Sequence, residues 1–459
     1  MNQQNQNVLQ LHPENHHYFM FRGKPTILIT SGEHYGAVLN LDFDYASYLE
    51  ELHANNLNHT RIFSGVYREI PGSFGITDNT LAPMPERYIC PWARSKQPGY
   101  YDGGNKFDLT KWDDEYFDRL KNFMSQASQL GIIVEMNLFC PFYTEDLWKA
   151  SPMNAANNIN GIGNCPRDEV YILKHEDLTA VQTAVTRKIV WELKEYDNLY
   201  YEICNEPYVG VVTMDWQHHI INTIIDAEKE FPFKHLISMN IANGRAKIQN
   251  PHPAVSIFNF HYAHPPDTVE MNYHLNRVIG ENETGFRGKD DALYRTEGWD
   301  FIIAGGAIYN NLDYSFTCKH PKGTFLEYKS PGGGSPKLRQ QLKILKEFIH
   351  SFNFIRMKPN NSIIKGGQAI SPMSGTPAQA SVTARALVEV GKQYAIYVNG
   401  GIKVKLLVDL PKGHYISEWL NTKTGKKEKV EEFEHAGGIR TLISPDYKGD
   451  IALRIMALQ

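Results

Sequence analysis

The sequence predicts a (β/α)8 TIM barrel followed by a smaller antiparallel β-sandwich. Its 459 residues are enough for one large domain and one smaller domain. Between about residues 26 and 355, strand patterns alternate with helix patterns, and the eight strands match the number in such a barrel. After about residue 358, short alternating runs separated by turn residues are typical of a β-sandwich. We therefore expect a barrel domain over 1–358 and a sandwich domain over 359–459.

The barrel begins with a predicted hairpin over residues 17–30, whose arms cover 18–21 and 26–30. A helix pattern follows at 43–55, with Asp42 as its cap. The next strand pattern covers 56–63. Together the strand, the helix and the strand form one β-α-β unit, which favours a parallel sheet.

Residues 64–112 interrupt this alternation with many glycines, prolines and aromatic residues. A connection of that length in a compact domain is usually functional, so we interpret it as a wall of the barrel mouth. For any single ring, an insertion that packs only against itself is an equally good interpretation. A second long loop covers 140–170 and contains Trp148. The rings of the first loop are Tyr67, Phe74, Tyr88, Trp92, Tyr100, Tyr101, Phe107 and Trp112.

The remaining elements follow in the same alternation. A helix pattern at 115–130 ends at Gly131, because glycine readily adopts the left-handed conformation that follows many helices. We expect Gly332-Gly333-Gly334, in the glycine-rich loop 331–336, to be a flexible connector. The later helix patterns cover 176–196, 216–230, 290–304 and 337–352. The strand patterns cover 132–139, 199–206, 235–240, 254–262 and 277–283, with the eighth starting at 307, and in the sandwich 384–390, 394–398, 404–408, 415–420, 441–443 and 451–455.

Composition narrows the classes of partner. The net charge of −4, without a basic stripe, gives no reason to expect nucleic acid. The five cysteines are widely spaced and predict neither a disulfide framework nor a zinc site. Aromatic residues make up 12% of the chain, and such rings suit ligands with apolar faces, sugars among them. We expect no cofactor and no metal.

The sequence gives two indications about location. No run of about 18 apolar residues is present, so no membrane span is expected. The first ten residues, MNQQNQNVLQ, are polar and contain no apolar signal core. We therefore expect either a cytoplasmic protein or a periplasmic or secreted one whose signal peptide is absent from this sequence, and we favour the second.

Functional side chains of a (β/α)8 barrel lie at the carboxyl ends of its strands. Glu206 stands at such an end, because Pro207 cannot continue the fourth strand. Glu283 stands at the end of the seventh strand, which faces the fourth across the mouth. We therefore expect both carboxyl groups to reach one glycosidic bond. Candidates for substrate binding are His34, Arg61, Asn137, Trp148, Asn205, His261, Tyr262 and Asn310.

Several motifs resemble those of the clan A glycoside hydrolases, the retaining (β/α)8 enzymes that include family 5. Asn205-Glu206-Pro207 is similar to their acid/base motif, and Glu283-Thr284-Gly285 to their Glu-x-Gly nucleophile motif. The resemblance covers roughly residues 20–355. One difference is that the clan often has a sugar-stacking Trp after strand eight, where this chain has 310-NNLDY-314. Further matching positions are Arg61, His261-Tyr262 and 297–307, with Tyr397, 419–421 and 450–453 resembling the appended β-domain of bacterial barrel hydrolases.

The resemblance implies cleavage of β-glycosidic bonds by double displacement, with an oligosaccharide or polysaccharide as the partner. Glu283 would attack the anomeric carbon, and the positive charge of Arg61 would hold its pKa low. Glu206 would stay protonated, donate its proton to the leaving oxygen and then activate water. Asn205 would hydrogen-bond the 2-hydroxyl group of the sugar.

Other acidic residues compete for these roles. Glu281 lies two residues before Glu283, so both are expected to project from the same side of the strand, but only Glu283 has the Glu-x-Gly context. Glu297 lies in a helix pattern and is expected to be a surface or packing residue. Glu135 and Glu202 lie within strands, where buried partners or a position facing the helices would explain them.

Two other functional classes stay open. A carbohydrate-binding protein could keep the fold without catalysis, although the presence of both acids argues against that. A metal-dependent hydrolase is suggested by the two histidines of His261-x-x-His264, but their spacing matches no catalytic zinc helix.

Overall fold

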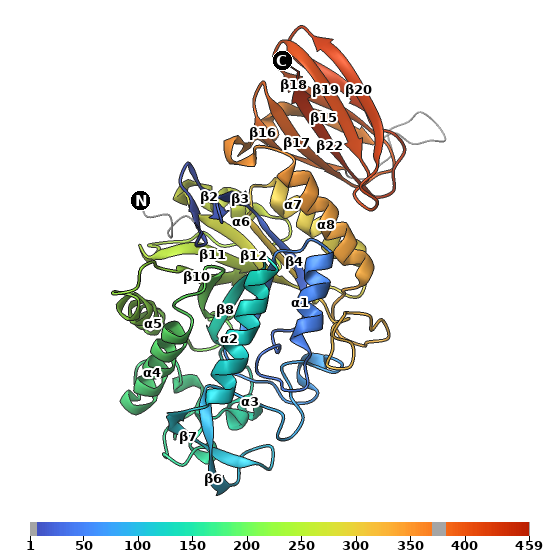
Figure 1. Ribbon diagram of the computed structural model, residues 1–459. Helices are drawn as coiled ribbons and strands as arrows, with labels where there is room; N and C mark the ends of the chain where they lie inside the picture. Colours follow the sequence, from blue (N-terminus) through green and yellow to red (C-terminus); the bar gives the residue numbers. More distant parts are fainter. Residues whose placement is uncertain (1–6, 370–381, 459) are drawn as a thin grey trace.

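The computed structural model describes residues 7–369 and 382–458. Its centre is an eight-stranded sheet, in the order β4-β13-β12-β11-β10-β9-β8-β5, whose paired neighbours all run parallel (Figure 1). The eight strands are those expected from the sequence, and they form a nearly closed barrel. Their bounds are β4 (Leu28–Gly32), β5 (His59–Phe63), β8 (Ile133–Phe139), β9 (Leu199–Cys204), β10 (Leu236–Asn243), β11 (Val255–His261), β12 (Val278–Thr284) and β13 (Ile308–Leu312).

The barrel closes between β4 and β5 through the side chain of Asn58. The Ile29 amide donates to Asn58 Oδ1 at 3.0 Å, and Asn58 Nδ2 donates to the Ile27 carbonyl at 3.0 Å. An asparagine side chain carries both a donor and an acceptor, so it can replace a peptide group between two edge strands. This bridge satisfies backbone groups of β4 that would otherwise be buried without partners.

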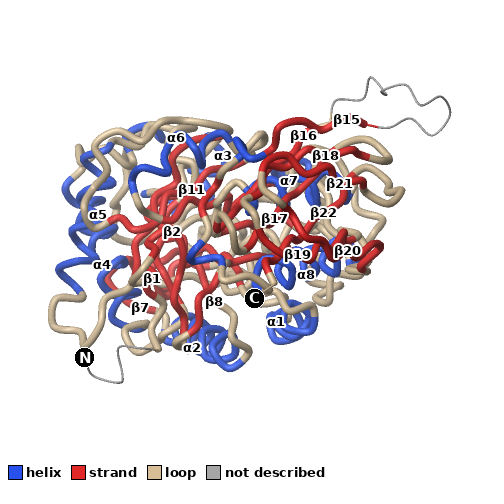
Figure 2. Tube along the Cα trace, turned by 90° about the horizontal axis from the view of Figure 1, so that it is seen from above, coloured by secondary structure: helices blue, strands red, loops and turns tan. Residues whose placement is uncertain are grey.

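Helices surround the strands, as Figure 2 shows. Each long helix buries an apolar stripe against the barrel, as an amphipathic pattern predicts. The cap of the first helix is Asp44 rather than Asp42, since Asp44 accepts from the Ser47 amide while Asp42 pairs with Arg87. Among the residues described, no helix is long and apolar enough to cross a membrane. The helices are α1 (Tyr45–Ala54), α2 (Asp114–Gln129), α3 (Glu145–Ala150), α4 (Glu176–Glu192), α5 (Met214–Ala227), α6 (Asp267–Asn272), α7 (Asp291–Ile303) and α8 (Pro336–His350).

Two small antiparallel sheets lie at opposite ends of the barrel (Figure 1). The first contains β1 (Gln10–His12), β2 (Asn15–Phe21) and β3 (Lys24–Thr26), so the second arm of the expected hairpin is divided between β3 and β4. The second sheet, β6 (Trp92–Pro98) with β7 (Asn105–Trp112), lies inside the 64–112 connection, where the sequence analysis expected no strands.

The C-terminal part contains two antiparallel sheets, as predicted. Six of the strands match the expected runs, whereas β14, β15 and β20 were not predicted. β20 is an edge strand with mostly charged residues, which discourage edge-to-edge pairing but hide the strand pattern. We propose the domain boundary near residue 358, where β14 begins. The sheets are β14 (Lys358–Pro359), β16 (Thr383–Glu389), β17 (Gln393–Asn399), β22 (Asp450–Ala457), β19 (Gly413–Leu420) and β20 (Lys427–His435), and β15 (Ile364–Ala369), β18 (Val404–Leu410) and β21 (Gly438–Ile443).

The larger of these sheets packs against α7 and α8 (Figure 1). The rings of Trp299 and Tyr397 stack across this contact at 5.5 Å. Asp450 is buried here and accepts from Arg295 at 2.7 Å and from Thr422 at 2.6 Å. The two parts of the chain are therefore joined by a buried ion pair as well as by apolar packing.

Asp450→Ala is expected to lower the free energy of unfolding by about 3 kcal/mol, because it leaves the buried Arg295 guanidinium without its carboxylate. Denaturant unfolding followed by circular dichroism measures this loss. Asp446→Ala is the matched control, since Asp446 is 85% exposed in its ion pair with Lys403 and is expected to contribute less than about 1 kcal/mol. Equal stability of the two variants would contradict the prediction.

Candidate active site

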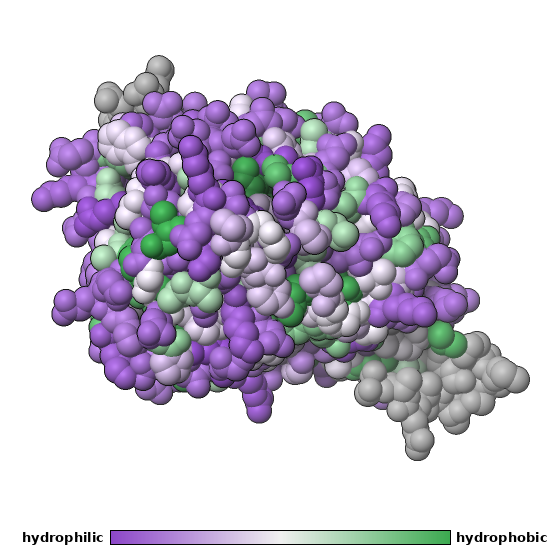
Figure 3. All heavy atoms as spheres, turned by 90° about the horizontal axis from the view of Figure 1, so that it is seen from below, coloured by the Kyte–Doolittle hydropathy of each residue, from purple (hydrophilic) through white to green (hydrophobic). Residues whose placement is uncertain are grey.

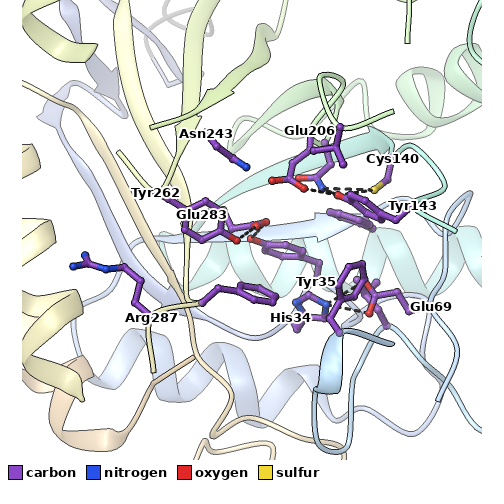
Figure 4. Close-up of a pocket in the computed structure, with 16 residues that line it drawn as sticks. His34, Tyr35, Glu69, Cys140, Tyr143, Glu206, Asn243, Tyr262, Glu283 and Arg287 are labelled. Carbon is purple, nitrogen blue, oxygen red and sulfur yellow. Dashed lines mark hydrogen bonds and ion pairs between the residues drawn. The ribbon is translucent and has the colours of Figure 1, made fainter. Parts of the chain in front are cut away.

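A cavity of about 500 Å³ opens at the carboxyl ends of the barrel strands. That size is typical of small-molecule sites. The face of the molecule seen in Figure 3 is mainly hydrophilic, with hydrophobic residues in several small patches. Figure 4 shows how the polar side chains converge on the cavity. It is lined by His34, Tyr35, Phe63, Glu69, Phe74, Leu81, Cys140, Tyr143, Asn205, Glu206, Val209, Asn243, Tyr262, Glu283, Phe286 and Arg287.

Glu206 and Glu283 face each other across this cavity (Figure 4). One oxygen of each carboxyl group and a ring nitrogen of His261 all lie within 4.8 Å of one another. His261 Nδ1 is 3.1 Å from Glu206 and 3.4 Å from Glu283, so the ring lies between the two acids. The acids are thus close enough to act on the same atom of a ligand.

Glu283 lies among hydrogen-bond donors. Tyr35 donates to it at 2.9 Å, Tyr262 at 2.8 Å and Arg61 at 3.3 Å. Burial raises the pKa of Glu283, but the charges of His261 and Arg61 and the hydrogen bonds from His261 and Tyr262 outweigh it and hold the pKa well below its usual range. Glu283 is therefore a carboxylate at neutral pH.

His261 has the opposite shift. Burial lowers the pKa of its imidazole, but the charge of Glu283 and the hydrogen bonds to Glu206 and Glu283 raise that pKa to about 9. The ring therefore carries a positive charge at neutral pH. This charge balances the negative charge of Glu283.

Glu206 is held by a different set of contacts. The Tyr143 hydroxyl donates to its carboxyl group at 2.7 Å and accepts from Asn205 Nδ2 at 2.7 Å. The backbone amide of Glu206 donates to Asn240 at 3.2 Å. The Tyr208 hydroxyl also donates to Glu206, at 3.4 Å. Each acid thus accepts hydrogen bonds from two tyrosines, but Glu283 also accepts one from Arg61.

The backbone around the cavity includes several residues in the left-handed region. The φ angles are +60° at Tyr35, +54° at Phe74, +37° at Glu206 and +51° at Tyr262. Residues other than glycine adopt this conformation at a cost of about 1–3 kcal/mol each, and such residues cluster at functional sites. Here the unusual backbone directs three hydrogen-bonding side chains and one ring into the same cavity.

Arg61 lies below the cavity and is fully buried. It donates to Glu135 at 3.3 Å, to Asn205 at 2.8 Å and to Glu202. Glu135 and Glu202 therefore have the buried partners that the sequence analysis offered as one explanation, and they face the barrel interior. Burial raises the pKa of Glu202 to about 8, against the opposing charge of Arg61.

Glu281 does not project from the same side of the strand as Glu283, contrary to expectation. The register of β11 and β12 shifts between Phe260–Glu281 and His261–Glu283, which is a β-bulge. The bulge turns Asn282 into the barrel, where it donates to Glu135 at 2.7 Å. Glu281 instead lies near Glu297 of α7, and burial and that neighbouring carboxylate raise its pKa well above the usual range.

Glu297 is a buried packing residue rather than a surface one. It is 1% exposed and accepts from Thr284 and Arg287, each at 3.1 Å. These contacts hold the chain just after Glu283 against α7. The helix pattern alone could not distinguish this inward position from a solvated one.

The glycine-rich run 331–336 is closely packed, not a flexible connector. A Cβ atom at Gly332 would lie 1.4 Å from the carbonyl oxygen of Gly285, and one at Gly285 would lie 2.7 Å from Leu312 Cβ. Glycine is required at both positions because two backbone segments and a side chain meet there. The run therefore supports the Glu283-Thr284-Gly285 segment from behind.

The predicted site residues fall into three groups. Glu206, Glu283, Asn205, Tyr262 and His34 line the cavity, while Arg61 and His261 are buried beneath it and contact the acids. The other three do not line it. Trp148 packs on Phe142 and donates to the Cys165 carbonyl, Asn310 donates to the Asn282 carbonyl, and Asn137 is buried in β8, so we leave them out of the proposed site.

Several residues that line the cavity were not predicted from the sequence, including Tyr35, Glu69, Tyr143 and Phe286. Tyr35 directly follows His34 after the first strand, so its position alone was a usable signal. Glu69 and Tyr143 lie in long loops, where periodicity gives no direction, and Phe286 lies in the short connection between β12 and α7. Of the eight rings in the first loop, Phe74 alone lines this cavity, and packing within the loop explains most of the others.

Glu206, His261 and Glu283 are also the residue types that bind metal ions. However, the same nitrogen of His261 contacts both carboxyl groups, and Tyr35, Tyr143, Tyr262 and Arg61 donate to their other positions. We therefore interpret the arrangement as two acids that are held in place by hydrogen bonds from neighbouring side chains.

A family model described as Domain of unknown function (DUF6298) matches residues 78–239. No curated protein matches the sequence at a significant level. Among solved structures, a candidate glycoside hydrolase from Bacteroides vulgatus ATCC 8482 aligns with a TM-score of 0.67 at 15% identity, covering 100% of this chain and 84% of that one. A family 5 glycoside hydrolase from the same organism aligns with a TM-score of 0.63 at 13% identity, covering 99% of this chain and 94% of that one.

Both alignments extend through the barrel and the C-terminal sheets. At such low identity the similarity concerns the fold and not the residues that carry activity. This chain therefore has the fold of these solved glycoside hydrolases, a (β/α)8 barrel followed by a β-domain.

Proposed function

We propose that the protein is a retaining glycoside hydrolase that cleaves β-glycosidic bonds in oligosaccharides or polysaccharides. The observation that carries this proposal is the pair of acids, Glu206 and Glu283, with oxygens within 4.8 Å at the barrel mouth. Retaining enzymes hold their two carboxyl groups about 5–5.5 Å apart, whereas inverting enzymes need about 6.5–9.5 Å to admit a water molecule. The fold shared with solved glycoside hydrolases supports the same class.

In the first step, a Glu283 oxygen forms a bond to the anomeric carbon as the bond to the leaving oxygen breaks. Glu206 gives its proton to that oxygen, so the leaving group departs as an alcohol. Tyr35, Tyr262 and Arg61 orient the attacking carboxylate. The product of this step is a glycosyl ester on Glu283 and a carboxylate on Glu206.

In the second step, Glu206 takes a proton from water, and the resulting oxygen attacks the anomeric carbon and releases Glu283. The Tyr143 hydroxyl, 2.7 Å from Glu206, holds this base in place in both steps. Asn205 donates to Tyr143 and lines the cavity, and we assign it the hydrogen bond to the 2-hydroxyl group. Two displacements at one carbon retain its configuration.

A carbohydrate-binding protein without catalysis is the second candidate. The aromatic lining of the cavity, which includes Tyr35, Phe63 and Phe286, favours it, because rings stack on sugars whether or not a bond is cleaved. However, sugar binding alone requires no pair of acids at this spacing. Absence of cleavage across a panel of aryl β-glycosides, with binding retained, would favour this alternative.

Glu206→Ala is expected to lower kcat/KM about 10²–10⁴-fold on glycosides with poor leaving groups, because no acid protonates the departing oxygen. On 2,4-dinitrophenyl glycosides, whose leaving group needs no proton, the first step should remain near the wild-type rate. Steady-state kinetics on both substrate classes tests this, with exposed Glu230→Ala as the control. Equal losses on both classes would contradict the acid role, and activity that requires an added divalent metal would favour the metal-dependent alternative.

A further inference from the structure

Glu69 is a third carboxylate in the cavity, and the double displacement gives it no role. It lies in the 64–112 connection, is 3% exposed and lines the cavity together with His34. His34 Nε2 is 3.2 Å from its Oε2, the Tyr67 hydroxyl donates to Oε1 at 3.3 Å, and Asn79 donates to Oε2. A buried acid held by three side chains has a fixed orientation.

This carboxylate retains the capacity to bind a ligand. A carboxylate has about four acceptor positions, and the donors His34, Tyr67 and Asn79 fill three of them. The cavity lining also contains Leu81 and the rings of Phe63 and Phe74, which cannot accept a hydrogen bond from a hydroxyl group as a carboxylate does. A sugar hydroxyl is the kind of donor that fits such a position.

Glu69 lies on the side of the cavity away from Glu206. In Figure 4, Glu206 and Asn243 lie on one side, His34 and Glu69 on the other, and Glu283 lies between them. Glu206 protonates the leaving oxygen, so the leaving group lies on its side. The sugar that is attacked by Glu283 therefore extends toward Glu69.

A compact loop closes the cavity at that end. The Glu69 amide donates to the Leu81 carbonyl at 2.8 Å, so the loop over 70–80 leaves and returns at one place, as an Ω-loop does. Phe74 of this loop lines the cavity, and its ring is 6.5 Å from that of Phe286 and 5.2 Å from that of Tyr143. Thr77 fixes the loop to the opposite wall through hydrogen bonds with Lys329 and Ser330, each 3.0 Å long.

We infer that the enzyme acts on the end of a sugar chain, and that Glu69 accepts a hydrogen bond from a hydroxyl group of the terminal sugar. Loop 70–80 covers the cavity beyond that sugar, so we expect the chain to extend past Glu206. His34 and Asn79 are positioning residues that orient the Glu69 carboxylate. This inference rests on the proposed glycosidase activity. It makes Glu69 the residue that determines specificity for a neutral sugar at the end of the chain.

The test compares Glu69→Gln with removal of single hydroxyl groups from the substrate. The probes are the 4-nitrophenyl glycoside that is cleaved best and its 3-, 4- and 6-deoxy analogues. The control variant is Glu115→Gln, which makes the same change of side chain at an exposed position of α2. We expect the wild-type kcat/KM to be about 10- to 100-fold lower for one analogue than for the parent glycoside. This factor corresponds to the loss of one hydrogen bond to a charged group. Glu69→Gln should lose a similar factor on the parent glycoside and almost nothing further on that analogue.

The role of Glu69 would be wrong if, for every analogue, the loss of kcat/KM caused by Glu69→Gln multiplied the loss caused by removing the hydroxyl group. That result would leave the proposed glycosidase activity unaffected. The wild-type deoxy series needs no variant, so poor folding of Glu69→Gln does not affect that part of the test. Action on chain ends is checked separately by product analysis, which should show stepwise release of single sugars from the non-reducing end. A rapid fall in the viscosity of a soluble polysaccharide would overturn end-directed action, whereas no cleavage of any glycoside would overturn the proposed function itself.

Discussion

Glu283→Ala is expected to lower kcat/KM on the order of 10⁵-fold, the largest effect of any single substitution in this chain. The carboxylate forms the covalent bond to the sugar, and no neighbouring group can replace it, because Tyr35, Tyr262 and Arg61 are donors that hold it in place. Removing it also opens space for a small anion next to the anomeric carbon. Added azide should therefore restore turnover and yield a glycosyl azide of inverted configuration.

The matched control is Glu281→Gln, two residues earlier on the same strand. Burial and the nearby Glu297 raise the pKa of Glu281 well above its usual range, so its neutral form resembles a glutamine amide at pH 7. Most activity should remain in this variant. The assignment of the nucleophile would be wrong if Glu281→Gln were inactive while Glu283→Ala retained turnover, or if azide gave a product of retained configuration.

The barrel and its two acids were predictable because both depend on local signals. The periodicity of strands and helices depends only on residues that are close together in the sequence. Pro207 likewise indicates the end of a strand without any tertiary information. The carboxyl ends of parallel strands then meet at one rim whatever their separation in the chain, so Glu206 and Glu283 could be placed together.

The remainder of the site depends on contacts that periodicity does not contain. The β-bulge in β12 reverses the expected direction of Glu281, and a two-residue alternation cannot reveal an extra residue. Glu69 and Tyr143 reach the cavity from long loops whose path is fixed by tertiary hydrogen bonds, such as that from the Glu69 amide to Leu81. β20 was missed because its mostly charged sequence suits a sheet edge rather than a buried strand.

Arg61→Met is expected to lower the free energy of unfolding by about 3–5 kcal/mol, because it removes the buried cation beside the ionised Glu283 and the hydrogen bonds to its other acidic partners. Arg61 is fully buried and contacts Glu135, Glu202 and Glu283. Methionine fills much of the space of the aliphatic stem, so the loss is chiefly electrostatic. Denaturant unfolding at pH 7 measures it.

The same variant should move the acidic limb of the pH profile of kcat/KM to higher pH. Glu283 must be ionised to attack, and the charge of Arg61 is one of the interactions that hold its pKa well below the usual range. Because the pKa of Glu283 is lower in the folded state than the unfolded value of about 4.3, its ionised form contributes its full stabilisation above that unfolded value. Both the ionisation and the stabilisation are lost as the pH falls through the folded pKa. Without Arg61 the folded pKa rises, so activity is lost at a higher pH than in the wild type.

Arg68→Met separates this effect from a general loss of stability. Arg68 is also buried, but its acidic partner is Asp102, at 3.5 Å, and it has no contact with either proposed catalytic acid. Its replacement should lower stability and leave the acidic limb in place. If both variants moved the limb equally, or if Arg61→Met left it unchanged, Arg61 would be a structural cation only, and the ionisation of Glu283 would depend on His261 and the two tyrosines.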